Sequence, residues 1–316
     1  PQTLSDEALF NIDQYVMGGG KLFVAAPGVQ MNDRMGMNQV MPNPPNINSI
    51  LEHYGLRISP NIVEDWKGGR SQVARTRGGT FVQYRDPFVF TTTHMEEDSP
   101  LSNKIPMMMF AYTSTVSNSD RGTSGTITTL ITSSENSRVQ EGPFTLEPTE
   151  LKPPTQTERL EPQSLAMMVS GRLTSRYASE APPVMTNDDG TTFTPAGDQI
   201  KQTSTGSPEV VVVGSALLMV DQAVSAVPAN ILLPLNVAEA FTRGSGALEL
   251  RARDLAVAQL RTVTPAEASW TQVLILVGMP MLLVIFGFIK MALNRRRRNS
   301  YRRIYGTPAH YEQPAD

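Results

Sequence analysis

Four residues with metal-ligating side chains lie together in the stretch THMEEDSP: His94, Glu96, Glu97 and Asp98. Imidazole and carboxylate groups are common metal ligands, so this cluster is the first candidate for chemistry. The stretch is polar, however, it precedes Pro100, and the chain contains only two more histidines. We therefore interpret it as a solvated acidic turn, keep His94 as a ligand candidate, and predict no metal site.

Asp221 is the second candidate, because it ends the valine-rich stretch EVVVVGSALLMVD and α/β folds place functional groups where strands end. One carboxylate without a base, nucleophile or phosphate loop does not make a catalytic site. The stretch NDDGT, residues 187–191, resembles part of a calcium loop but lacks a ligand at Val184 and a glutamate at the twelfth position. The esterase pattern G-x-S-x-G is also absent from the sequence. We predict no catalytic residue and no cofactor.

A third candidate is the glycine-rich stretch GGGK, residues 18–21, which could be taken for a phosphate loop. Such a loop needs a strand first, then the glycines, then a helix. Here the order is reversed: a helix with Ser5 as its N-cap precedes the glycines, and the apolar KLFVAA follows them. The Walker pattern would also need a hydroxyl at Leu22. The glycines therefore indicate a helix C-terminus, with Gly18 at the left-handed position.

Composition limits the function classes further. The chain has 316 residues, enough for one large or two modest domains, and its lack of cysteine excludes thiol catalysis and disulfides. The net charge of −3 is uneven: from Lys290 onward there are seven basic and two acidic residues, and the remainder is acidic. An acidic body is not expected to bind nucleic acid. Because Pro1 lies just before a predicted helix, we expect a fragment or processed product without its upstream strand and targeting segment.

The strongest signal is the uncharged stretch TQVLILVGMPMLLVIFGFI, from Thr271 to Ile289. Its length matches the roughly 20 helical residues that cross a bilayer, and a buried globular helix seldom runs so long without a polar stripe. Arginines directly after an apolar span favour a cytoplasmic tail over a nucleic-acid-binding segment. The residues assigned to anchoring and topology are Trp270, Pro280, Lys290, Arg295, Arg296, Arg297 and Arg298.

The body reads as alternating helices and apolar strands, which predicts a three-layer, Rossmann-like α/β domain. Four consecutive valines at 210–213 favour a parallel strand buried on both faces. Helices are expected at 47–54, closed by Gly55, and at about 230–241, and residues 27–45 are expected to form a loop. The predicted domains are 1–262 (extracytoplasmic body, with a mobile insertion at about 178–208), 263–270 (linker), 271–293 (transmembrane helix) and 294–316 (basic cytoplasmic tail).

The order of these segments resembles the extracytoplasmic domain of GldG-like proteins, which are auxiliary subunits of gliding-motility-type ABC transporters. The resemblance implies a Rossmann-like domain similar to class I glutamine amidotransferases, without their catalytic cysteine. It also implies two partners, a polytopic permease and a cytoplasmic ATPase. This chain has no Walker A motif, so any ATP hydrolysis must be done by another subunit. Ser215 stands where the family often has an acidic residue. The stretches that carry the resemblance are LSDEALFNIDQYVMGGGKLFVAAPG, ILEHYGLRISPNIVED, SPLSNKIPMMMFAYTSTV, TTLITSSENS, EVVVVGSALLM, LPLNVAEAFTRGSGALELRAR and the arginine-terminated apolar span.

The favoured hypothesis is a non-enzymatic auxiliary subunit in a bacterial inner membrane, with the body periplasmic and the tail cytoplasmic. Its expected partners are the permease, the ATPase and the lipid bilayer, with no nucleic acid, and a homo- or hetero-oligomer is left open. Two alternatives are a membrane-tethered hydrolase that uses Asp221 or residues 94–98, and a binding protein for polysaccharide or peptide. The latter would hold its ligand at the carboxyl ends of the strands.

Overall fold

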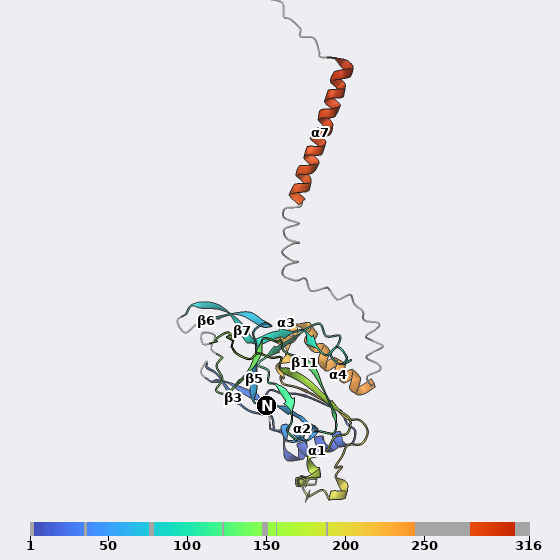
Figure 1. Ribbon diagram of the computed structural model, residues 1–316. Helices are drawn as coiled ribbons and strands as arrows, with labels where there is room; N and C mark the ends of the chain where they lie inside the picture. Colours follow the sequence, from blue (N-terminus) through green and yellow to red (C-terminus); the bar gives the residue numbers. More distant parts are fainter. Residues whose placement is uncertain are drawn as a thin grey trace, which may run out of the picture. The chain divides into compact units, whose positions relative to one another are not determined.

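The structure is a computed structural model that describes residues 3–34, 37–75, 79–121, 123–146, 151–155, 157–187, 189–243 and 279–306. The chain divides into two compact units, Pro1–Leu255 and Ala256–Asp316, which are considered separately. The first unit is a mixed α/β domain, and the described residues of the second unit form a long helix (Figure 1).

The elements have the following bounds. The α-helices are α1 (Asp6–Met17), α2 (Asn48–Tyr54), α3 (Asp221–Ala226), α4 (Leu232–Arg243) and α7 (Met279–Tyr305), and the 3₁₀ turns are η1 (Arg176–Ala178), η2 (Gly197–Gln199), η3 (Leu217–Met219) and η4 (Pro228–Ile231). The strands are β1 (Leu22–Ala25), β2 (Val29–Arg34), β3 (Met37–Pro42), β4 (Leu56–Ile58), β5 (Asn61–Asp65), β6 (Gly69–Arg75), β7 (Phe81–Thr92), β8 (His94–Met95), β9 (Met108–Ala111), β10 (Val116–Asn118), β11 (Thr126–Thr132), β12 (Ser137–Glu141), β13 (Ser164–Ser170), β14 (Met185–Thr186), β15 (Thr192–Phe193) and β16 (Glu209–Val213).

The main sheet has five strands in the order β1-β16-β13-β11-β8. The valine-rich strand β16 lies inside it, with all four valines fully buried, as the uninterrupted apolar run predicts. It pairs parallel with β1 but antiparallel with β13. A Rossmann-like sheet is mainly parallel, whereas β1–β16 is the one parallel pair among the described strands. The structure therefore supports the mixed α/β class and does not confirm the Rossmann-like expectation.

Helices cover both faces of this sheet, and the alternation of side chains along β16 decides which core each valine joins. Val210 and Val212 pack with side chains of α1 and α2. Val211 and Val213 pack in the other core with side chains of α4, including Leu233. The strand is thus buried twice, once against each helical layer.

The first helix begins and ends as the sequence predicts. The Ser5 hydroxyl accepts a hydrogen bond from the Ala8 N–H at 3.2 Å, and Gly18 is the C-cap. The left-handed residue is Gly19, at φ +90°, and not Gly18, which has φ −73°. The second helix likewise ends at Gly55 with φ +94°, which lets the chain reverse directly into β4.

Smaller sheets complete the first unit: β6-β7-β9, and the pairs β2–β3, β4–β10, β5–β12 and β14–β15. The expectation of a loop at 27–45 is wrong, because Val29–Arg34 and Met37–Pro42 form an antiparallel hairpin. Its strands are rich in Asn and Met and have no strict polar–apolar alternation, so the usual strand signal is missing. The expected insertion at 178–208 contains β14, η2 and β15, and its mobility stays a prediction.

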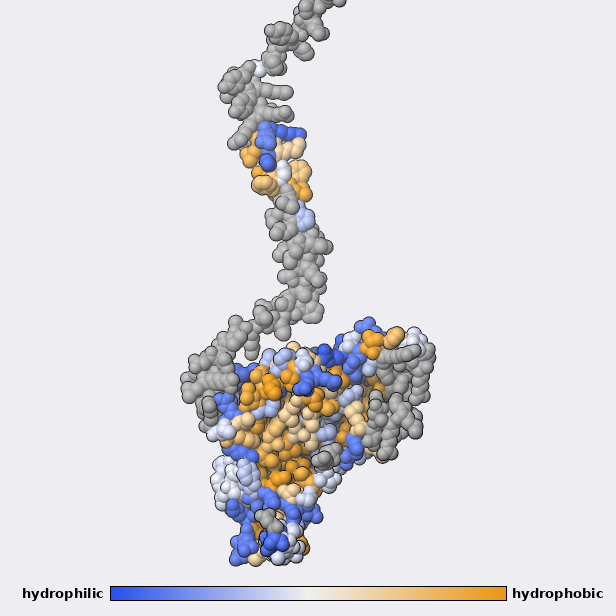
Figure 2. Space-filling view, turned by 180° about the vertical axis from the view of Figure 1, so that it is seen from behind, coloured by the Kyte–Doolittle hydropathy of each residue, from blue (hydrophilic) through white to orange (hydrophobic). Residues whose placement is uncertain are grey.

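Hydrophobic side chains also reach the surface. Figure 2 shows them gathered across the middle of one face of the folded unit, with polar side chains at the margins. One group of exposed apolar residues follows the chain from η3 into α4, and we call it the η3–α4 surface. It consists of Leu217, Met219, Val220, Ile231 and Leu235.

The second unit contains α7, in which Pro280 lies in the first turn and Lys290 and Arg295 are exposed. Arg296, Arg297 and Arg298 belong to the same helix. Trp270, the linker 263–270 and the beginning of the predicted span lie outside the described residues. Within the part of the chain that the structure describes, no helix has a long enough apolar stretch for a membrane crossing.

Candidate functional site

The glycine-rich stretch has a structural role in the described part of the chain. The Lys21 ammonium lies 3.3 Å from a Glu209 carboxylate oxygen, donates to the Ala240 carbonyl at 3.3 Å, and lies 5.6 Å from the Phe241 ring centroid. The lysine therefore links β1 to β16 and α4. Because its charge is used inside the fold, the geometry gives no support to a phosphate site.

The acidic cluster also lacks the geometry of a metal site. His94 is exposed in β8, and its Nδ1 lies 3.1 Å from the Thr92 hydroxyl. Among the residues that the structure describes, no three His, Asp or Glu side chains are placed to share a cation. In the stretch predicted as a turn, Asp189 accepts hydrogen bonds from the Thr191 N–H and hydroxyl at 2.9 and 2.6 Å.

The sequence suggested that Asp221 ends a strand, and the structure shows that it does not. The valine-rich strand stops at Val213, the chain passes through η3, and Asp221 begins the short helix α3 with its side chain exposed. An acidic residue in the first turn suits the helix dipole, which accounts for it structurally. Neither Asp221 nor His94 lines the pocket described below.

The carboxyl ends of β1 and β16, where α/β folds commonly bind ligands, are filled by the chain itself. The buried Ser114 donates its hydroxyl to the Asn61 carbonyl at 2.7 Å and accepts from the Gly28 N–H at 2.8 Å. Its own N–H donates to the Gly214 carbonyl at 2.8 Å. A Cβ on Gly214 would lie 1.9 Å from the Ser114 carbonyl oxygen. The close approach leaves no space for a ligand between these segments.

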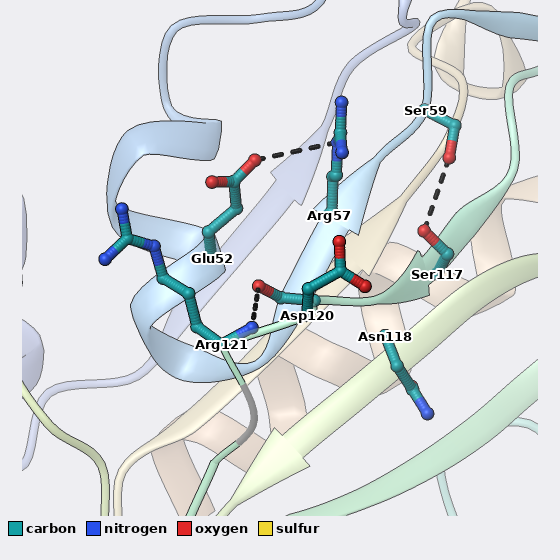
Figure 3. A pocket seen from close by; sticks show the side chains of 8 residues that line it. Glu52, Arg57, Ser59, Ser117, Asn118, Asp120 and Arg121 are labelled. Atoms are coloured by element: carbon teal, nitrogen blue, oxygen red, sulfur yellow. Dashed lines mark hydrogen bonds and ion pairs between the residues drawn. The ribbon is translucent and has the colours of Figure 1, made fainter.

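A polar pocket of about 330 Å³ lies elsewhere, between α2 and the β4–β10 pair (Figure 3). In β4, Leu56 and Ile58 point into the core, so Arg57 points outward, and Ser117 of β10 is its register partner. Both side chains therefore lie on the solvent face of the pair. The complete lining is Glu52, Arg57, Ser59, Ser117, Asn118, Ser119, Asp120 and Arg121.

Charges of both signs meet in this pocket. Arg57 Nε lies 3.6 Å from a Glu52 carboxylate oxygen, and the Ser59 and Ser117 hydroxyl oxygens are 3.3 Å apart (Figure 3). The Arg121 guanidinium and the Asp120 carboxylate have no hydrogen-bond partner among the described residues. The pocket offers cation, anion and hydroxyl groups but no histidine that could activate a serine. These groups could hold a small polar ligand by ion pairs and hydrogen bonds.

A buried carboxyl group, that of Asp13, holds α2, the helix that supplies Glu52, in place. Asp13 of α1 accepts hydrogen bonds from the Tyr54 hydroxyl at 2.8 Å and the Ser175 hydroxyl at 2.6 Å. All three residues are fully buried. Burial raises the pKa of Tyr54 far above its ordinary range, and the neighbouring Asp13 raises it further, so the tyrosine stays a donor. Asp13 therefore ties α1 and α2 to the segment at Ser175.

His53 is in the last turn of the same helix, α2, and its Nε2 is buried without a hydrogen bond among the described residues. A Glu180 carboxylate oxygen is 3.6 Å away. Burial lowers the pKa of His53 most, and the positive charge of Arg121 lowers it further. The imidazole is consequently held in its neutral form over a wider pH range than an exposed histidine.

Sequence reasoning missed both the pocket and the Asp13 network. The alternation Leu56-Arg57-Ile58-Ser59 was a usable signal for an outward-facing arginine. The pairing of β4 with β10 had no local signal, because the two strands lie far apart in the sequence. Without that pairing, nothing brings Arg57 and Ser117 together.

Comparison with known proteins identifies the family. A solved structure titled "mmIFT52 N-terminal domain" is similar at a TM-score of 0.39 and 13% identity, over 77% of this chain and 73% of that one. Among curated proteins there is no significant match. Residues 1–237 match the ABC transport auxiliary family, described as "ABC-type uncharacterized transport system". That match covers more than half of the sequence, so the chain belongs to the ABC transport auxiliary family.

Proposed function

We propose that this chain is a non-enzymatic, membrane-anchored auxiliary subunit of an ABC transport complex, of the GldG-like type. The observation that carries the proposal is the family match over residues 1–237, followed in the same chain by the uncharged stretch Thr271–Ile289 and an arginine block. In this arrangement residues 271–293 cross a bacterial inner membrane, the body is periplasmic or otherwise extracytoplasmic, and the tail is cytoplasmic.

The partners we propose are a polytopic permease and a cytoplasmic ATPase. The sequence lacks a Walker A motif, so ATP hydrolysis in such a complex requires another subunit. The η3–α4 surface supports a protein contact, because five large apolar side chains are exposed between Leu217 and Leu235.

Topology and assembly are tested separately. Because the chain has no cysteine, the variants T194C and N299C each present one thiol, the first on the exposed surface of the body and the second in the tail. The cells are treated so that the outer membrane is permeable and the inner membrane stays intact. A maleimide that cannot cross the inner membrane should then label T194C and leave N299C unlabelled. The reverse pattern would contradict the proposed orientation.

Mild detergent extraction should recover a permease and an ATPase with the chain, and recovery of the chain alone would argue against the complex.

The polar pocket favours a second candidate function, recognition of an extracytoplasmic saccharide or peptide. Arg57, Arg121 and Asp120 provide charges of both signs, and the serines provide donors and acceptors. A panel of charged disaccharides and tripeptides should raise the melting temperature of the chain, and R57A should abolish the rise. The matched control is R172A, outside the pocket. Equal shifts for R57A and the unmodified chain would exclude the pocket as the binding site.

A further inference from the structure

The β6–β7 hairpin differs in charge from the rest of the body. Residues 69–85, GRSQVARTRGGTFVQYR, contain four arginines and no acidic residue, although the body as a whole is acidic. The hairpin extends to one edge of the folded unit (Figure 1). A basic projection on an acidic domain indicates a local partner with negative charge.

Two strongly exposed apolar side chains, Val73 and Phe81, lie on one face of this hairpin. Val73 of β6 is the register partner of Gln83, and Phe81 lies two positions before Gln83 in β7. Opposed residues in an antiparallel pair lie on the same face, and side chains alternate along each strand. Val73 and Phe81 therefore lie on one face, with exposed fractions of 66% and 72%.

Two arginines at the base of the hairpin are exposed but not neutralised. Arg85 Nη1 donates to the Trp66 and Lys67 carbonyls at 3.1 and 3.2 Å. Arg70 Nη1 lies 2.9 Å from the Met109 sulfur, but Arg70 is the register partner of the buried Asp86 and lies on the opposite face from Val73. Neither guanidinium forms an ion pair with a carboxylate among the described residues.

We propose that the β6–β7 hairpin rests on an anionic phospholipid surface, with Val73 and Phe81 among the headgroups and Arg85, on the same face, facing phosphates. Exposed aromatic and aliphatic groups beside an arginine complement the apolar and anionic character of that interface. The free edge of β6 favours a shallow position, because its unpaired backbone groups need water or headgroup oxygens. The inference rests on the proposed function in one respect only, that the body is held beside a membrane.

The test places a single environment-sensitive fluorophore on the hairpin. The full chain carrying V73C is labelled and reconstituted into vesicles of phosphatidylcholine alone or with phosphatidylglycerol. The matched control is V184C, a second valine with a similar exposed fraction of 60% in the same unit. We expect emission from position 73 to shift to the blue with the anionic lipid, to return at high salt, and to be lost in V73C/F81S. Position 184 should not respond.

The lipid contact of the hairpin and the membrane insertion of the C-terminal segment are measured independently, so either can be refuted without the other. Flotation with vesicles at alkaline pH reports membrane insertion of the C-terminal segment, whereas the fluorophore reports the hairpin. Equal emission from position 73 in neutral and anionic vesicles would overturn the lipid proposal, as would equal responses at positions 73 and 184. A shift that requires a co-purified permease and not the lipid would overturn it as well, because the hairpin would then bind protein.

Discussion

Replacing Asp13 tests whether the buried carboxyl group holds α1, α2 and the Ser175 segment together. In Asp13→Ala, the hydroxyls of Tyr54 and Ser175 lose their acceptor, and both residues are fully buried. Each unsatisfied buried donor costs about 1–3 kcal/mol, and losing the buried carboxyl group offsets part of that cost. We therefore expect the free energy of unfolding to fall by about 4 kcal/mol.

For a domain of this size, such a loss corresponds to a melting temperature lower by roughly 8–16 °C. Asp13→Asn keeps one acceptor oxygen but directs an N–H toward the remaining hydroxyl, so a loss of about 2 kcal/mol is expected. Tyr54→Phe removes a donor and leaves the carboxyl its other partners, so it should cost about 1 kcal/mol. The measurement is urea unfolding followed by circular dichroism, with a common denaturant slope across the variants.

The double variant D13N/Y54F distinguishes a network from two independent effects. If the hydrogen bond between the two side chains is the cause, the combined loss should fall short of the sum by at least about 0.5 kcal/mol. Strict additivity, or a loss below about 1 kcal/mol for Asp13→Ala, would refute the reasoning. The helix would then be positioned by apolar packing alone.

Three further predictions concern other parts of the first unit. Gly214→Ala should cost about 3 kcal/mol in unfolding free energy, because its Cβ would lie 1.9 Å from the Ser114 carbonyl oxygen, whereas Gly197→Ala, with nothing within 4 Å, should change it by less than about 0.5 kcal/mol. Asn230→Ala should cost about 3 kcal/mol in a thermal or urea melt, because its buried amide pairs the backbone of β9 and η3. The lowered pKa of His53 means that the unfolded chain binds a proton more readily, so stability should fall as pH drops below 6.5, and His53→Gln should flatten that decline; an unchanged pH profile would contradict the assignment.

Local patterns predicted the elements whose residues are neighbours in the sequence. The valine run of β16 is buried on both faces because a strand between two helical layers has no solvent side. The first helix could be bounded from Ser5 and the glycines, since caps act within one turn. A closer look at its apolar stripe would also have found Asp13, four residues after Leu9 on the same face.

Strand direction and long-range pairing were not readable from the sequence. A buried apolar strand has the same composition whether its neighbour runs parallel or antiparallel, so β13 gave no sign that it pairs antiparallel with β16. The pocket depends on β4 meeting β10, and the filled strand ends depend on Ser114 reaching Gly28 and Gly214. These contacts join segments that are distant in the chain, and local propensity cannot encode them.

The distribution of polar groups separates stability from function in this domain. Asp13, Asn61, Asp65 and Asn230 are buried, and each has several hydrogen-bond partners inside the fold. The groups that remain available to a ligand or partner lie at the surface, in the polar pocket, on the η3–α4 surface and on the β6–β7 hairpin. A protein that acts by contact should therefore respond to mutation in two ways. Substitutions in the buried set should lower stability and reduce assembly only through unfolding, whereas surface substitutions should weaken binding at unchanged stability.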